Sequence, residues 1–93
     1  MFISRIQAIP CKRVDGIAWY RIKDVCCALQ VRQDKASKLV DKADKYREYV
    51  YRPGFRSYHA YYINRRGVES IITRYCGQFG GHTRGELMSA LPP

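Results

Sequence analysis

Hydrophobic and polar residues alternate over several short stretches of the chain, and a period of two residues is typical of β-strands. Residues 2–9 and 17–21 both show this period, with a polar segment between them. That segment ends in Asp15-Gly16, a dipeptide that favours a tight hairpin turn. We therefore predict a first β-hairpin in which residues 2–9 pair with residues 17–21.

A second hairpin is predicted further along the chain. Residues 48–52 and 57–63 are rich in tyrosine and in β-branched residues, which pack well on a pleated sheet. Pro53-Gly54 lies between them and favours a turn. We therefore expect these two strands to be antiparallel neighbours.

A period of 3.6 residues follows each predicted hairpin and indicates amphipathic helices. After the first hairpin, Val25, Ala28 and Leu29 recur at helical spacing and predict a helix of about two turns. After the second hairpin, Asn64 is a natural N-cap. The apolar face of the helix that it opens consists of Val68, Ile71, Ile72 and Tyr75.

Two further helices are predicted. Beyond a short break at Gln30–Arg32, apolar residues again recur at helical spacing. These residues are Ala36, Leu39, Val40 and Ala43. Because the break is so short, this helix and the one before it should cross steeply, in a helix-turn-helix-like pair. Residues 77–82 form a loose glycine-rich segment, and residues 86–91 predict a last short helix.

Together these elements predict an α+β fold, a small single domain over residues 1–93 with two β-hairpins each followed by helix. A chain of 93 residues is too short for two separate cores, so one core is expected. The residues that we expect to be buried together are Trp19, Val25, Leu29, Leu39, Val40, Val68, Ile71 and Ile72.

The four cysteines, Cys11, Cys26, Cys27 and Cys76, are expected to be reduced and mostly core-filling. Neighbouring Cys26 and Cys27 point in different directions on a helix, and the N-terminus has no apolar run of signal-peptide type. No apolar run is long enough to cross a membrane. We therefore expect an intracellular protein without a membrane partner.

Charge indicates the kind of partner. The chain has 17 basic and eight acidic residues, a formal net charge of +9. The excess positive charges repel one another in the compact state unless an anion neutralises them. We therefore expect the partner to be a polyanion. The basic residues are spread among eight tyrosines, and no long basic amphipathic helix is evident. This distribution favours nucleic acid over a membrane surface.

The sequence offers little for catalysis or metal binding. Neither of the two histidines, His59 and His82, has a cysteine or serine at a spacing that indicates a catalytic pair. The eight carboxylates are scattered and do not form the acidic cluster of a metal-dependent nuclease. No Cys-x-x-Cys or His-x3-His spacing prepares a zinc site. We expect no enzymatic activity, catalytic residue, metal, cofactor or small-molecule substrate.

The second predicted helix has the most interpretable basic surface. At about 100° per residue its lysines would fall in one stripe beside the apolar face. The stripe consists of Lys35, Lys38, Lys42 and Lys45. Two interpretations remain open. The stripe is either a solvated face whose lysines pair at i+4 with Asp34 and Asp41, or a surface that follows a phosphate backbone. In the second case Arg32 and Gln33 lie at its N-terminal end.

Other basic residues lie beside predicted turns and helix starts. Arg52 and Arg56 flank the turn of the second hairpin, which fits either a phosphate contact or an edge hairpin kept soluble by charge. Arg65 and Arg66 open a helix, where the dipole disfavours cations and a bound phosphate would offset that cost. Alternatively, Arg65 pairs with Glu69.

Two strand-to-helix segments carry residue types in a characteristic order. The first contains Trp19-Tyr20, Lys23-Asp24-Val25, Leu29 and Ala36. The second contains Tyr62-Ile63-Asn64, Gly67-Val68 and Ile71-Ile72. In this order they resemble the Bro-N domain, a small DNA-binding module of large DNA viruses of insects and of phage antirepressors. The resemblance covers about residues 17–75, and residues 87–92 look like the last helix of the family.

The resemblance implies a viral early protein that binds DNA without catalysis and regulates transcription or replication in the nucleus or cytoplasm of the infected cell. The duplex DNA contacts are inferred from the charge pattern of this sequence alone. The predicted nucleic-acid-binding residues are Arg32, Gln33, Lys35, Lys38, Lys42, Arg52, Arg56, Arg65 and Arg66.

We also expect a homodimer, because a thin core and many tyrosines on short strands leave apolar surface that a monomer would expose. The competing interpretation is a protein-interaction module. In that case the tyrosine-rich hairpin docks on a second copy or on a host factor, and the charge serves solubility.

Overall fold

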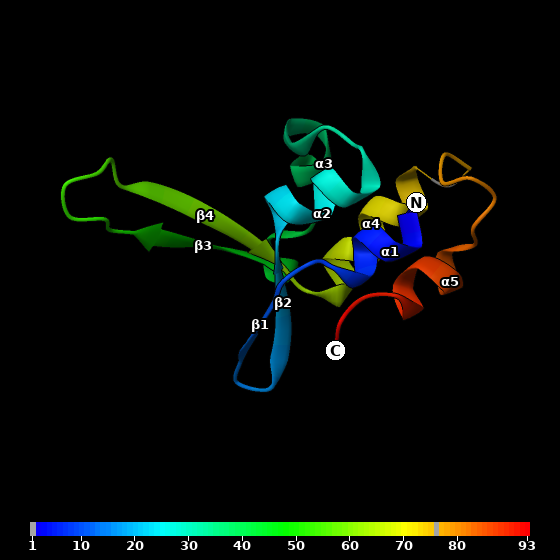
Figure 1. Cartoon of the computed structure of the whole chain (residues 1–93), viewed down its shortest axis with the longest axis horizontal. Helices are drawn as coiled ribbons and strands as arrows, with labels where there is room; N and C mark the ends of the chain where they lie inside the picture. The colour runs from blue at the N-terminus through cyan, green and yellow to red at the C-terminus, as the bar shows by residue number, and fades with distance from the viewer. Residues whose placement is uncertain (1, 76) are drawn as a thin grey trace.

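Two antiparallel hairpins join into one four-stranded sheet (Figure 1). The computed structural model describes residues 2–75 and 77–93. Its strands are β1 (Cys11–Val14), β2 (Ile17–Arg21), β3 (Lys45–Val50) and β4 (Tyr58–Ile63). Their order in the sheet is β1-β2-β4-β3, so the hairpins meet through β2 and β4. The predicted α+β fold with two hairpins is confirmed.

The helices gather at one side of the molecule (Figure 1). They are α1 (Phe2–Gln7), α2 (Ile22–Leu29), α3 (Gln33–Lys38), the 3-10 helix η1 (Lys42–Asp44), α4 (Arg65–Arg74) and α5 (Arg84–Ser89). β2 runs directly into α2, and β4 runs into α4 through Asn64 alone, as the sequence predicted. The core lies where these helices meet the sheet, and Tyr20, Val25, Ile63 and Ile71 are fully buried in it.

The first hairpin has the predicted turn but a different first strand. Asp15 and Gly16 both have positive φ angles, 53° and 80°, as a two-residue type I′ turn requires. Such a turn pairs the residues on its two sides, so Val14 lies opposite Ile17 and the strand that precedes the turn is β1. The prediction of a strand over residues 2–9 was wrong.

Residues 2–7 form the helix α1 instead. Phe2, Ile3 and Ile6 fit one face of a helix as well as they fit a strand, and a short apolar run cannot be assigned by its period alone. The helical arrangement buries Ile6 and Ile9 in the core cluster. Tertiary burial therefore decides the structure of this segment.

The second predicted helix is shorter than its apolar spacing indicated. α3 ends at Lys38 and η1 follows separately, so a single helix through Ala43 was a wrong prediction. Strand pairing limits the length of this helix. β3 begins at Lys45, which lies opposite Ile63, and a helix that continued through Ala43 would move Lys45 away from this position. α2 and α3 are nevertheless two helices separated by residues 30–32, as predicted.

Most of the predicted core is confirmed. Val25, Leu29, Val40, Val68, Ile71 and Ile72 are buried in one cluster. Trp19 and Leu39 are only half-buried. Trp19 packs edge-on against Tyr46, with 4.7 Å between ring centroids and 86° between ring planes. Its ring therefore supports the second hairpin rather than the helical core.

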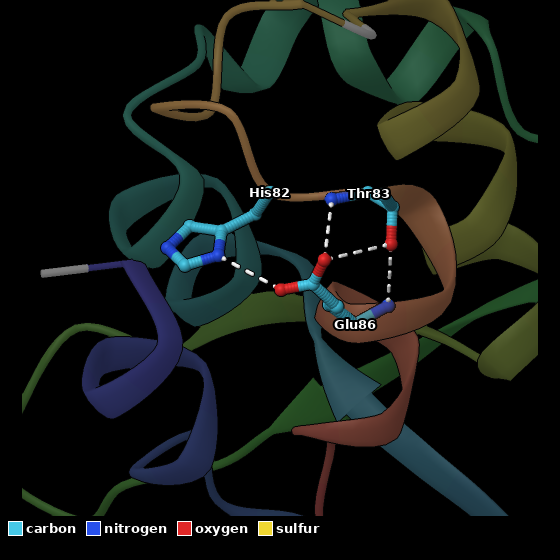
Figure 2. A network of polar contacts seen from close by, with 3 residues as sticks. All are labelled: His82, Thr83 and Glu86. Carbon is cyan, nitrogen blue, oxygen red and sulfur yellow. Dashed lines mark hydrogen bonds and ion pairs between the residues drawn. The ribbon is translucent and has the colours of Figure 1, made fainter.

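A capping box begins the last helix (Figure 2). The Glu86 N–H donates to Thr83 Oγ1 at 3.2 Å, and the Thr83 N–H donates to Glu86 Oε1 at 3.4 Å. His82 Nδ1 lies 3.3 Å from the other carboxylate oxygen. The bond to His82, then those to Thr83, lower the pKa of the Glu86 carboxyl. The helix predicted over residues 86–91 is confirmed with earlier bounds.

The glycine-rich segment before this helix contains no helix or strand over residues 77–82, as predicted. Phe79 nevertheless anchors it to the core. Its side chain is 2% exposed and meets Phe2 of α1 edge-on, with 5.4 Å between ring centroids. The segment is therefore fixed at its centre although it lacks regular structure.

Asp44 and Asn64 tie together the two ends of the second hairpin, and we term this pair the Asp44–Asn64 clasp. The Asn64 N–H donates to the Asp44 carbonyl at 3.0 Å, and Asn64 Nδ2 donates to Asp44 Oδ1 at 3.1 Å. Asn64 Oδ1 accepts the Gly67 N–H at 2.9 Å, which confirms the predicted N-cap. One side chain therefore joins η1, the end of β4 and the start of α4.

Gly67 allows α4 to approach the clasp closely. A Cβ atom at this position would lie 3.0 Å from Ile63 Cβ and from Val40 Cγ1, and 3.4 Å from the Asp44 carbonyl oxygen. Ile63 Cβ cannot withdraw without moving β4, because it is attached to paired backbone. The first turn of α4 therefore has little room for any side chain at Gly67.

We expect Gly67→Ala to lower the free energy of unfolding by about 1–3 kcal/mol, the usual cost of overpacking. This cost should outweigh the gain of about 1 kcal/mol from alanine as a helix former. Gly85→Ala is the matched control, because a Cβ there meets only Thr83 Oγ1, at 4.0 Å. Urea unfolding of both variants measures the difference. Equal stabilisation by the two changes would show that the junction has room.

Asn64→Ala should destabilise the protein more than Thr83→Ala does. Each variant loses an N-cap, which costs about 1 kcal/mol. Only Asn64→Ala also leaves the carboxylate of Asp44, which is 6% exposed, without its Nδ2 donor, and this adds about 1–3 kcal/mol. Thermal unfolding of the two variants tests this. Equal losses would mean that the bond to Asp44 contributes nothing.

Candidate nucleic-acid interface

The second hairpin stands away from the rest of the molecule as a finger, residues 45–63 (Figure 1). β3 and β4 pair along their whole length, from Lys45 opposite Ile63 to Val50 opposite Tyr58. The finger makes the molecule elongated, with extents of 45, 27 and 25 Å. Its base is held by the Asp44–Asn64 clasp, and its tip, residues 51–57, lies beyond the last strand pair.

Aromatic rings join the base of the finger to the first hairpin. Tyr46 meets Trp19 edge-on and stacks on Tyr62, with ring centroids 5.2 Å apart and planes at 14°. Lys12 lies over the Tyr62 ring and pairs with Glu48 at 2.7 Å. The bond to Glu48 raises the pKa of the Lys12 ammonium. These contacts fix the direction in which the finger projects.

The opposite side of the finger is exposed and combines aromatic with basic side chains. Side chains alternate along a strand, so every second residue of β3 and β4 lies on this side. It consists of Arg47, Tyr49, His59 and Tyr61, which we term the finger face. Tyr49 is 60% exposed, and its ring centroid lies 5.3 Å from that of His59. Such a surface suits stacking and phosphate contact.

α3 continues the finger face at its base. Tyr61 shares a hollow of about 480 Å³ with Gln33 and Lys38 of α3. Asp34 also lines this hollow, but it pairs with Arg32 at 3.2 Å rather than with Lys38. Two of the predicted binding residues, Gln33 and Lys38, therefore lie beside the finger, and Arg32 precedes Gln33 in the chain.

The predicted lysine stripe does not form one helical face. Lys35 and Lys38 are exposed on α3, whereas Lys42 lies on η1. Lys45 is half-buried at the start of β3 and donates to the Ser37 carbonyl at 2.8 Å, so it caps the end of α3. The early end of α3 is the physical reason. The first three lysines remain exposed cations on neighbouring elements.

The tip carries two of the predicted arginines, Arg52 and Arg56, and both are exposed. The Phe55 N–H donates to the Arg52 carbonyl at 2.9 Å and Gly54 has a φ of 77°, so residues 52–55 form a closed β-turn. The Arg52 guanidinium lies 5.1 Å from the centroid of the Phe55 ring. Residues 49–63 include no acidic side chain, so Arg52 and Arg56 give this part of the finger a positive charge without an internal counter-charge.

Arg65 and Arg66 lie in another region, together with Arg13. The three arginines line a cavity of about 840 Å³ between the turn of the first hairpin, the start of α4 and the C-terminal segment. Arg13 donates to a carbonyl of its own turn at 3.1 Å, and Arg65 donates to the Met88 carbonyl at 2.9 Å rather than pairing with Glu69. None of the residues that line the cavity is acidic.

The predicted binding residues are therefore spread over both ends of β4, with Arg52 and Arg56 at the tip and the others near the base of the finger. The six residues of this strand, at about 3.3 Å each, put roughly 20 Å between the tip and Asn64. In Figure 1 the finger leaves the molecule on the left, whereas the start of α4 lies near the C-terminus. At the base, the residues of α3 and η1 lie beside the finger face, whereas Arg65 and Arg66 line the separate cavity with Arg13.

Sequence reasoning missed Arg13, Arg47, Tyr49 and Phe55 as candidate contacts. The alternation of the predicted strand could have identified Arg47 and Tyr49, because they lie on one side of it. Phe55 could have been noticed as an apolar residue beside a turn and next to an arginine. Arg13 gives no local signal, because only the folded chain brings it near Arg65.

The cysteines differ in their surroundings. Cys26 is buried, and burial raises the pKa of its thiol to about 11, which disfavours the reactive thiolate. Cys11 is half-buried, and both residues are free thiols. Cys27 is free but exposed, because neighbouring residues of α2 point in different directions, as expected for this pair. Cys76 lies outside the described residues.

Residues 2–75 and 77–93, which the structure describes, contain neither a metal-binding cluster nor a membrane-spanning helix. No group of three or more His, Cys, Asp or Glu side chains is placed to hold a metal ion in this part of the chain. In the same residues, no helix combines the length and apolar character needed to cross a membrane.

No family model, no curated protein and no solved structure matches the chain. The resemblance to the Bro-N domain therefore stays a prediction from the sequence. The function has to be argued from the geometry and the charges of the two cationic regions.

Proposed function

We propose that the protein binds duplex DNA mainly through phosphates and has no catalytic role. The finger carries this proposal, because it is a two-stranded ribbon without an acidic side chain over residues 49–63 (Figure 1). Two-stranded β-ribbons of DNA-binding proteins enter the major or the minor groove of the duplex. Arg52 and Arg56 at the tip would then meet phosphates beside the groove.

α3 and η1 supply a second set of contacts in this arrangement. Lys35, Lys38 and Lys42 are exposed near the base of the finger, where their ammonium groups would follow the phosphates of one strand. Arg32 and Gln33 lie at the start of α3 and are the candidates for base contact. A good bidentate contact discriminates against the wrong base by about 1–3 kcal/mol.

The cavity with Arg13, Arg65 and Arg66 would hold a further phosphate of the same duplex. Carbonyl oxygens orient two of its guanidinium groups without neutralising them. The roughly 20 Å along β4 that separates this cavity from the tip is less than one turn of duplex, about 34 Å. One DNA molecule could therefore contact both regions.

The resemblance to the Bro-N domain suggests a role for this binding. It supports a viral regulator of transcription or replication that acts in the nucleus or cytoplasm of the infected cell. The DNA-binding proposal itself depends only on the charges and geometry of the finger, α3 and the cavity.

Replacing Arg52 and Arg56 by glutamine should weaken duplex binding and make it less sensitive to salt. Each phosphate contact contributes about 0.9 to the slope of log K against log salt concentration, so the double variant should lose about 2. Fluorescence anisotropy titrations on a random-sequence duplex at several salt concentrations measure this slope.

The control for this experiment is the double variant Arg5→Gln, Arg74→Gln. It removes the same net charge from exposed positions on α1 and α4, outside the finger, α3 and the cavity. It should therefore keep most of the slope. An equal loss in both double variants would mean that net charge alone drives binding. Absence of wild-type binding at about 50 mM salt would refute the proposed function.

Self-association is a second candidate function, because the finger exposes large apolar rings. Tyr49 is 60% exposed and Tyr51 71%, and β3 is an edge strand of the sheet. Pairing of two β3 edges would extend the sheet and cover part of this surface. We expect a dimer in sedimentation experiments at micromolar concentration. A single species of monomer mass would contradict the homodimer and leave a monomer as the DNA-binding form.

A further inference from the structure

Phe55 places an apolar ring at the outermost part of the molecule. It is 71% exposed and lies in the turn at the tip of the finger, beyond the last strand pair. Chains of this size have few large apolar side chains to spare, and this one contributes nothing to the core cluster. The ring is therefore free to contact a partner without disturbing the core.

The turn holds this ring in a defined position. The hydrogen bond from the Phe55 N–H to the Arg52 carbonyl closes the turn at 2.9 Å, and Pro53 restricts the backbone within it. Gly54 supplies the positive φ of 77° that the turn needs. The base of the finger is fixed by the contact between Trp19 and Tyr46 and by the Asp44–Asn64 clasp. The Phe55 ring therefore lies at the end of a hairpin whose direction is fixed.

The charges around the ring indicate what it meets. The Arg52 guanidinium lies 5.1 Å from the ring centroid, and Arg56 follows Phe55 directly in the sequence. An apolar ring beside one guanidinium and next in sequence to a second arginine matches the DNA duplex at a base step, where stacked bases lie between two phosphate backbones. An apolar protein pocket would gain nothing from the flanking charges and would have to desolvate them.

We propose that Phe55 inserts between two stacked base pairs and bends the duplex that the finger binds. This inference rests on the proposed function, since it needs the finger to lie on duplex DNA. Apolar wedges from other proteins unstack a base step and kink DNA by about 20–90°. Arg52 and Arg56 hold the phosphates on either side while the ring enters. Pyrimidine–purine steps, which unstack most easily, are the preferred points of entry.

The bend is measured on a duplex of about 30 base pairs with a central TA step and a fluorophore at each end. Energy transfer between the fluorophores should rise when wild-type protein saturates the duplex. Phe55→Ser should abolish this rise, and Phe55→Leu should keep most of it, because leucine is also an effective wedge. A 2-aminopurine base beside the TA step should brighten with wild type and with Phe55→Leu only.

Two controls keep the result specific to the tip. Val14→Thr removes an exposed apolar side chain beside the turn of the first hairpin, outside the finger, and should leave the bend unchanged at saturation. Thermal unfolding of Phe55→Ser should match wild type, because the ring is outside the core. If Phe55→Ser abolishes the bend and leaves the melting temperature unaltered, the loss results from the missing ring and not from misfolding.

The outcomes separate this inference from the function on which it rests. Salt-dependent duplex binding without a bend, or with the same bend in Phe55→Ser, would overturn the wedge and leave DNA binding intact. Tighter binding to single-stranded DNA than to duplex, dependent on Phe55, would make the tip a stacking platform and also overturn it. Failure to bind duplex at all would overturn both proposals.

Discussion

The Asp44–Asn64 clasp is the contact on which the arrangement of the rest depends. Through its backbone and its amide group, Asn64 ends β4, caps α4 and bonds to the residue before β3. The two ends of the finger are therefore fixed to each other and to the helical core at one point. Gly67 lets α4 approach that point without a side chain between them. With a weaker junction the finger would stay attached but could change direction, so the position of its tip relative to the core would no longer be fixed.

Much of the fold could be predicted because the signals were local. Asp15-Gly16 and Pro53-Gly54 specify turns by their own backbone preferences, and Asn64 specifies a helix start by the reach of its short side chain. Residues close in sequence make these interactions, so they leave a pattern that a single sequence reveals. The same holds for the exposed arginines of the finger, Arg52 and Arg56, which follow from the turn that they flank.

The predictions from sequence were wrong where contacts with distant segments decide the local structure. α1 is a helix because Ile6 and Ile9 gain a place in the core, and α3 ends early because Lys45 must pair with Ile63. Neither partner is visible in the local pattern. The predicted lysine stripe failed for the second of these reasons, and the cavity with Arg13 was missed because distant segments form it. Spacing predicts a candidate site on one helix only where that helix keeps its expected length, and it does not predict a site that distant segments form.

The positions of the charges explain how a chain with a formal net charge of +9 can remain compact. Some of its cations are matched by backbone carbonyls or by single carboxylates, as with Lys45 on Ser37 and Lys12 on Glu48. The arginines at the tip of the finger lie far from the core, where water and distance weaken their repulsion on it. This arrangement stabilises the free protein and leaves the outer charges available to a polyanion. The finger thus separates two demands that conflict in a small domain, a stable interior and a strongly cationic surface.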